Sequence, residues 1–100
     1  MQMMLHRNEF GVPQYLGHDA RRLLVLLASI DLLERPTASA LADLTSHDKN
    51  RIDDEIRDLQ EQFGVAIHRV GEVYRINSWG EVLNREGVKR FLRLDPEENR

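Results

Sequence analysis

The chain of 100 residues contains no cysteine. This absence excludes a disulfide scaffold, a thiolate zinc site and a cysteine nucleophile, and it is compatible with a reducing compartment. The sequence also lacks any apolar run near the roughly 20 residues that a membrane-spanning helix needs, and its N-terminus lacks the basic start and apolar core of a secretory signal. We therefore expect a soluble protein without a membrane partner, with the cytoplasm as its default location.

The chain also lacks an excess of positive charge, because 14 Lys and Arg stand against 17 Asp and Glu, a formal net charge of -3. Wholesale coating of nucleic acid usually needs a basic surface, so this balance argues against it. Residues 36–64 carry three Lys or Arg against seven Asp or Glu, whereas residues 65–94 carry six Lys or Arg against three Asp or Glu. Acidic and basic residues are therefore segregated along the chain.

The residue patterns of common catalytic and metal sites are missing. The four histidines, His6, His18, His47 and His68, show no helical i, i+4 spacing, and such spacing is typical of metal sites on helices. The glycines are scattered and form no phosphate-binding loop, and no nucleophile motif is present. We expect no enzyme activity, no cofactor and no metal ion.

The apolar content is that of a globular domain, at 41% of the residues. A chain of this length is enough for one domain. A helix is predicted over residues 20–34, with Asp19 as its N-cap and Pro36 stopping it. Its apolar residues recur on one face at helical spacing, namely Leu23, Leu26, Leu27, Ile30 and Leu33.

Two further helices are predicted before the chain turns to strands. The first covers residues 38–44 after the N-cap Thr37, and the second runs from the cap Asp48 to about Phe63. Gly64 suits the left-handed residue that ends such a helix.

From residue 65 the apolar period changes to two, which predicts a β-hairpin over residues 65–76 with its turn at Gly71 and Glu72. A last helix is predicted over residues 84–92, with Asn84 as its cap. Trp79 is expected in the core or, with Phe91 and Leu92, in a dimer interface.

This order of elements resembles the winged helix-turn-helix of bacterial transcriptional regulators, especially the DNA-binding heads of the biotin-repressor and DeoR-like families. The resemblance lies in RRLLVLLASIDLLERPTASALADLT at residues 21–45 and IDDEIRDLQEQFGVAIHRVGEVYRI at residues 52–76. It implies an α+β fold of three helices, a two-stranded hairpin wing and a C-terminal helix. The expected divisions are an arm at 1–18, the winged domain at 19–77, a helical extension at 78–94 and a tail at 95–100.

The resemblance also implies double-stranded DNA as the partner and a set of contact residues. Lysine, asparagine and arginine at the start of the third helix suit base edges, and basic residues elsewhere suit phosphates. The candidates are His47, Lys49, Asn50 and Arg51 at the helix start, His68, Arg69 and Arg75 on the hairpin, and Arg85, Lys89, Arg90 and Arg93 on the last helix. An ordinary solvated first turn remains an alternative for the first group, as do ion pairs with the acidic third helix for the last.

The third helix departs from the pattern of such regulators. One turn into this helix it carries Asp53, Asp54 and Glu55 in succession, followed by Asp58 and Glu61, and carboxylates repel DNA phosphates. A pair between Asp53 and Arg57 would relieve part of this repulsion.

Two functions follow from the sequence. The first is a small sequence-specific DNA-binding protein, a transcriptional regulator that binds two half-sites as a homodimer. The alternative is a winged-helix protein-interaction module, an adaptor or a nucleic-acid-mimicking inhibitor, that uses the acidic third helix.

Overall fold

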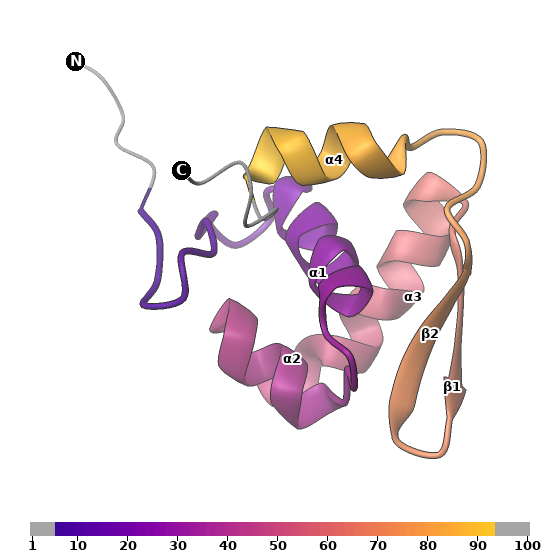
Figure 1. The fold of residues 1–100 in the computed structure, drawn as a ribbon, viewed down its shortest axis with the longest axis horizontal. Helices are drawn as coiled ribbons and strands as arrows, with labels where there is room; N and C mark the ends of the chain where they lie inside the picture. Colours follow the sequence, from indigo (N-terminus) through magenta and orange to yellow (C-terminus); the bar gives the residue numbers. More distant parts are fainter. Residues whose placement is uncertain (1–5, 94–100) are drawn as a thin grey trace.

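The first apolar stripe of the sequence forms helix α1, Arg21–Leu32, which lies at the centre of the fold (Figure 1). The structure is a computed structural model that describes residues 6–93. Within these residues the order is α1, α2 (Ala38–Thr45), a short 3-10 helix η1 (Lys49–Arg51), α3 (Ile52–Phe63), β1 (Ala66–Val70), β2 (Val73–Ser78) and α4 (Arg85–Leu92). The predicted α+β class is confirmed, with four α-helices and one antiparallel two-stranded sheet in the described part of the chain.

Helix α1 is shorter than the predicted 20–34. Ala20 occupies the N-cap position without a side-chain cap bond, so the predicted N-cap Asp19 lies one residue too early. The Asp19 carboxylate still accepts a hydrogen bond from the backbone N–H of Arg21 at 2.9 Å. At the other end Leu33 has an extended backbone, with φ -76° and ψ 140°. The helix therefore ends at Leu32, well before Pro36.

Local capping explains where the next helices begin. The Thr37 hydroxyl accepts from Ala40 N–H at 3.1 Å and starts α2, as predicted. Asp48 also acts as a cap, accepting from Asn50 N–H at 2.9 Å, but the turn that it caps is η1. Helix α3 itself begins only at Ile52.

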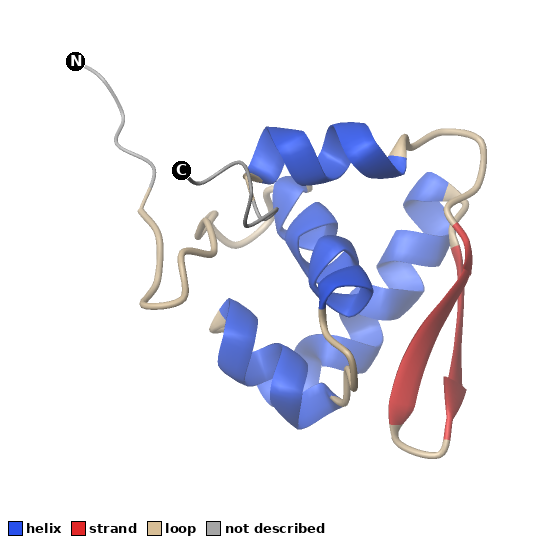
Figure 2. Cartoon of the chain, viewed as in Figure 1, coloured by secondary structure: helices blue, strands red, loops and turns tan. Residues whose placement is uncertain are grey.

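The hairpin pairs Ile67 with Ile76 and Val70 with Val73 across the turn at Gly71 and Glu72, as predicted. Its second strand also contacts the segment between α1 and α2, because Tyr74 N–H donates to the Pro36 carbonyl at 2.9 Å. Figure 2 shows the hairpin extending from the end of α3 along one side of the helices.

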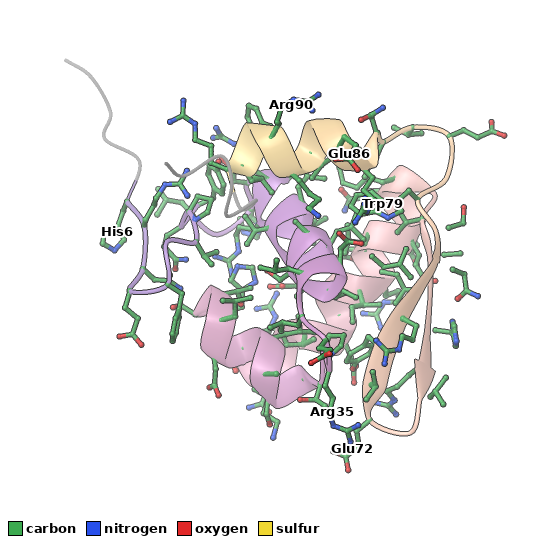
Figure 3. All side chains as sticks on the ribbon, viewed as in Figure 1. His6, Arg35, Glu72, Trp79, Glu86 and Arg90 are labelled. Carbon is green, nitrogen blue, oxygen red and sulfur yellow. The ribbon has the colours of Figure 1, made fainter. Side chains whose placement is uncertain are left out.

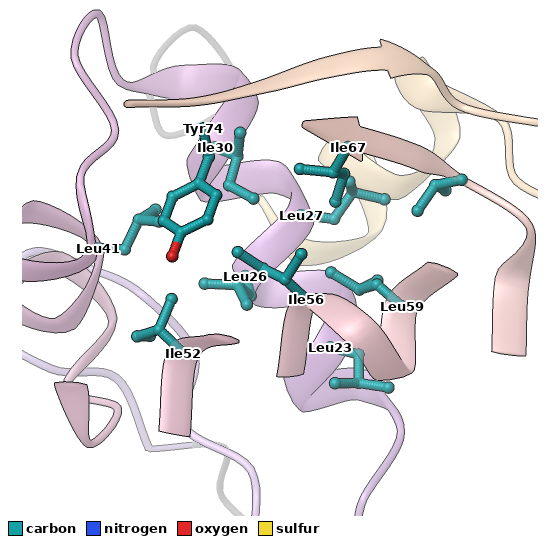
Figure 4. Close-up of a cluster of buried hydrophobic side chains, with 11 residues drawn as sticks. Leu23, Leu26, Leu27, Ile30, Leu41, Ile52, Ile56, Leu59, Ile67 and Tyr74 are labelled. Carbon is teal, nitrogen blue, oxygen red and sulfur yellow. The ribbon is translucent and has the colours of Figure 1, made fainter. Parts of the chain in front are cut away.

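Two groups of buried apolar side chains hold these elements together. The larger group joins α1, α2, α3 and the hairpin. Figure 4 labels ten of its members, Leu23, Leu26, Leu27, Ile30, Leu41, Ile52, Ile56, Leu59, Ile67 and Tyr74. The smaller group joins α1 to α4 and comprises Val12, Val25, Ala28, Val88 and Leu92. Trp79 and Leu83 pack against both groups, so the loop before α4 links the two.

The described part of the N-terminal arm packs against the helices. Val12 is 1% exposed and belongs to the smaller core group. The Asn8 amide donates to the Leu44 carbonyl at 2.8 Å, and the Gln14 amide donates to the Thr45 carbonyl at 3.0 Å. The arm therefore supports the end of α2. The predicted tail at 95–100 lies outside the described residues.

Across residues 6–93, every helix is too short or too polar to traverse a lipid bilayer.

Candidate nucleic-acid interface

The turn between α2 and α3 presents a short polar tip formed by Lys49, Asn50 and Arg51. Ser46 ends α2 in the left-handed conformation, with φ 68°, and the Thr45 hydroxyl accepts from His47 N–H at 3.1 Å. These local bonds place the three predicted base-reading residues in η1, where all three side chains are exposed.

Lys49 and Arg69 line one depression of about 160 Å³, although they come from η1 and β1. The other lining residues are Thr37, Ala38 and Ser39 at the beginning of α2, and Glu72 and Tyr74 of the hairpin. Figure 1 shows the beginning of α2 and the hairpin turn at the same end of the molecule. The fold therefore brings the predicted base-reading residue Lys49 and the predicted wing residue Arg69 together with the first residues of a helix. We call this feature the Lys49–Arg69 depression.

Arg69 lies between Tyr74 of the hairpin and Asp53 of α3. Its guanidinium lies 5.8 Å from the centre of the Tyr74 ring and 4.0 Å from the Asp53 carboxylate. The Tyr74 hydroxyl donates to Asp53. Burial, followed by this hydrogen bond to a carboxylate, raises the pKa of Tyr74. Asp53 is thus turned toward the hairpin, and its charge is partly offset by Arg69.

The other two hairpin candidates do not line this depression. His68 and Arg75 are opposite each other in the sheet and both are exposed. Arg75 donates to the Glu34 carbonyl at 3.3 Å, and the His68 ring contacts the Asn77 amide oxygen. Of the predicted wing residues, only Arg69 meets the tip.

Arg51 lies beside a different depression of about 160 Å³, next to Glu55 and Asp58 on α3 and Arg22 on α1. The three tip residues are therefore not equivalent. Lys49 is placed toward the hairpin, whereas Arg51 is placed toward the arm and the start of α1.

The prediction of a DNA contact by His47 does not fit the structure, because this side chain is buried. His47 as a whole is 5% exposed, and its Nδ1 lies 2.9 Å from Oε1 of Glu55. The second oxygen of Glu55 lies 3.5 Å from the Arg22 guanidinium. His47 therefore joins the turn to α3 and α1, and we leave it out of the interface.

The three acidic side chains in the first turn of α3 point in three different directions. Asp53 faces the hairpin, and Glu55 faces His47 in the interior. Asp54 is exposed and pairs with Arg57 at 2.9 Å, so the predicted pair between Asp53 and Arg57 is wrong. Residues three apart on a helix are neighbours, and Asp53 is drawn away by the Tyr74 hydroxyl.

Two of the predicted basic contacts on α4 are engaged with a residue of α1. The Asp31 carboxylate lies 2.9 Å from the Arg85 guanidinium and 3.1 Å from the Lys89 amine. Arg90 and Arg93 remain exposed. The predicted alternative of ion pairs therefore applies to half of this group, with α1 and not α3 supplying the carboxylate. Asp31 was not singled out by sequence reasoning, although it interrupts an otherwise apolar stretch.

Asp31 also makes the stability of the fold depend on pH. Burial of its carboxyl raises the pKa, but hydrogen bonds from Arg85 and Lys89 outweigh this effect and lower the pKa below the ordinary 3.8. A lowered pKa in the folded state contributes stability at pH values above 3.8, and this contribution is lost as the pH falls through the folded-state pKa. We expect urea midpoints to fall less steeply below pH 4 in Asp31→Asn than in the natural chain. Equal slopes would contradict this prediction.

Figure 3 displays the side chains around the fold, with Arg90 and Glu86 on α4 and with Arg35 and Glu72 at the end that holds the Lys49–Arg69 depression. Among residues 6–93, no three histidine or acidic side chains gather closely enough to hold a metal ion.

Comparisons of the chain with family models, with curated proteins and with solved structures returned no match.

Proposed function

We propose that this chain is a winged helix-turn-helix protein that binds double-stranded DNA in a sequence-specific manner and regulates transcription as a homodimer on two half-sites. The observation that supports the proposal is the Lys49–Arg69 depression. Two cations from separate elements line it together with the beginning of α2, and cations and helix-terminal amides are the groups that bind phosphate.

Within this proposal, the tip and the hairpin make the DNA contacts. A backbone phosphate occupies the Lys49–Arg69 depression and sets the position of the protein on the duplex. Asn50 and Arg51, the other two exposed residues of the tip, then reach base edges in the major groove. Asp58 and Glu61 lie further along α3, and their charge keeps the rest of that helix away from the phosphates.

The proposal predicts a smaller salt dependence when one cation of the depression is removed. Each phosphate contact contributes about 0.9 to the slope of log affinity against log salt concentration. Lys49→Ala and Arg69→Ala are each expected to weaken binding to random duplex DNA and to reduce the slope by about 1. The measurement is fluorescence anisotropy over a series of salt concentrations.

Arg21→Ala is the matched control for this experiment. It removes the same charge from the start of α1, where Asp19 already holds the guanidinium at 2.5 Å. Its slope should equal that of the natural chain. Equal slopes in all three variants would contradict the assignment of the depression, and no binding by the natural chain at low salt would contradict DNA binding itself.

A second candidate is the protein-interaction module. The exposed outer side of α3 carries Asp54 and Glu61, with Asp58 half-buried beside them, and Arg57 is already paired with Asp54. This side suits a basic protein surface. Absence of DNA binding at low salt, together with specific capture of a basic protein by way of these carboxylates, would favour this candidate.

A further inference from the structure

An apolar groove of about 220 Å³ lies between α4, the loop before it and α1. Its lining contains one polar residue, Asn84, together with Leu24, Val82, Leu83, Gly87, Val88 and Phe91. Two of these side chains stand out from the surface, since Phe91 is 61% and Val82 is 69% exposed. Single exposed apolar residues are common, but large ones that flank an apolar groove form the kind of patch that marks an interaction site.

The groove contains a projecting side chain, Phe91, and a recess at Gly87. Phe91 and Gly87 are four residues apart on α4, so they lie one turn apart on the same side of the helix. Gly87 has no side chain, but the Asn84 side chain covers part of it, since a Cβ at Gly87 would lie 3.2 Å from Asn84 Oδ1. The groove of about 220 Å³ still exceeds the roughly 150 Å³ that holds a benzene ring. Because the projecting side chain and the recess belong to one surface, a two-fold axis brings each projecting side chain to the recess of the other copy.

We propose that a second copy of this chain docks in this groove, with the two α4 helices antiparallel and Phe91 of each copy seated beside Gly87 of the other. The inference rests on the proposed homodimer for its choice of partner, and it identifies the surface that forms the homodimer.

The charges of α4 favour the antiparallel arrangement. Glu86, which pairs with Arg85 of its own chain at 2.6 Å, and Arg90 are both exposed and lie one turn apart, on either side of the helix centre near Val88. In an antiparallel pair with its axis near Val88, Glu86 of each copy lies opposite Arg90 of the other. A parallel pair would instead place Arg90 beside Arg90.

The remaining cations of α4 are neutralised within the chain. Within residues 6–93, the ion pairs of this helix involve Arg85 and Lys89, which contact Asp31 or Glu86, and they leave Arg90 out. Asp31 therefore reduces the repulsion between two basic helices as they approach each other. Arg90 keeps its charge for a partner.

The position of the groove is compatible with DNA binding by the same molecule. Figure 1 shows α4 at the opposite end of the molecule from the hairpin turn and the beginning of α2. A dimer formed through α4 leaves the Lys49–Arg69 depression of each copy exposed.

The test is the mass of the full chain in solution, measured by sedimentation over a range of concentrations. The natural chain is expected to reach twice its mass of 11.7 kDa. Phe91→Arg is expected to weaken association at least about 30-fold, the effect of losing a residue that dominates an interface. The matched control is Phe10→Arg, because Phe10 is 57% exposed on the arm. This control should dimerise as the natural chain does, and circular dichroism checks that both variants are folded.

Charge exchange tests the orientation of the helices. Glu86→Arg and Arg90→Glu should each weaken the dimer, and the double variant should restore it. A monomeric natural chain, or a Phe91→Arg variant that dimerises normally, would overturn the interface. Failure of the double variant to restore association would overturn the antiparallel arrangement. A natural chain that dimerises but does not bind DNA would contradict the proposed function alone.

Discussion

Replacing Gly80 with alanine is expected to lower the free energy of unfolding by roughly 2–5 kcal/mol, because two unfavourable effects act at this position. Gly80 has a left-handed backbone with φ +75°, which alanine adopts at a penalty of about 1–2 kcal/mol. An added Cβ would also lie 2.5 Å from the Gly64 carbonyl oxygen. Gly64 is itself the left-handed C-cap of α3, so neither backbone can shift without disturbing the other.

Gly71→Ala separates the two effects. Gly71 has a similar φ of +65° in the hairpin turn, but a Cβ there would meet no atom within 4 Å. Its expected penalty is therefore the conformational part alone, about 1–2 kcal/mol. Both values come from urea unfolding followed by circular dichroism. Equal losses in the two variants would contradict close packing between Gly80 and the end of α3.

The consequence of this packing is structural as well as energetic. The loop that contains Gly80 also carries Trp79 and Leu83, which pack against both core groups. A displacement at Gly80 would therefore weaken the packing of this loop between α4 and the rest of the fold.

Local signals in the sequence were enough to predict the order of elements. Thr37 and Asn84 are residue types whose side chains bond to the backbone a few residues ahead, and both cap helices in the structure. Gly64 is a residue type that adopts the left-handed conformation easily, and it ends α3 in that conformation. These features depend on residues close in the chain, and a sequence displays such residues directly.

Features that depend on distant residues were not predictable in this way. His47 and Glu55 are eight residues apart, and their contact requires the turn and α3 to fold together. Asp31 meets Arg85 across 54 residues. The same holds for the candidate interface, because the sequence indicated that Lys49 and Arg69 are basic but not that they line one depression.

Glu55→Ala is expected to lower the free energy of unfolding by about 3 kcal/mol, the second large effect. Removing one partner of a buried hydrogen bond leaves the other polar group unsatisfied, at a penalty of about 1–3 kcal/mol. The His47 side chain is 2% exposed, whereas that of Arg22 is 25% exposed and keeps some contact with water. Because the variant also loses the contact with Arg22, we place the effect at the upper end of that range.

The neighbouring residue Asp54 supplies the control for this prediction. Asp54 also pairs with an arginine, but its side chain is 51% exposed and that of Arg57 is 60% exposed. Asp54→Ala should change the free energy of unfolding by no more than about 0.5 kcal/mol. If the two variants lost the same stability, the contact between Glu55 and His47 would not be buried in solution.

The position of Glu55 links this loss of stability to the candidate interface. Its two oxygens contact His47 in the turn and Arg22 in α1, and the tip residues Lys49 to Arg51 lie between His47 and Glu55 in the chain. Glu55→Ala should therefore speed amide hydrogen exchange in the tip more than in the hairpin, even where the variant is fully folded. Uniform acceleration across the chain would mean that Glu55 supports the whole fold and does not specifically position the tip.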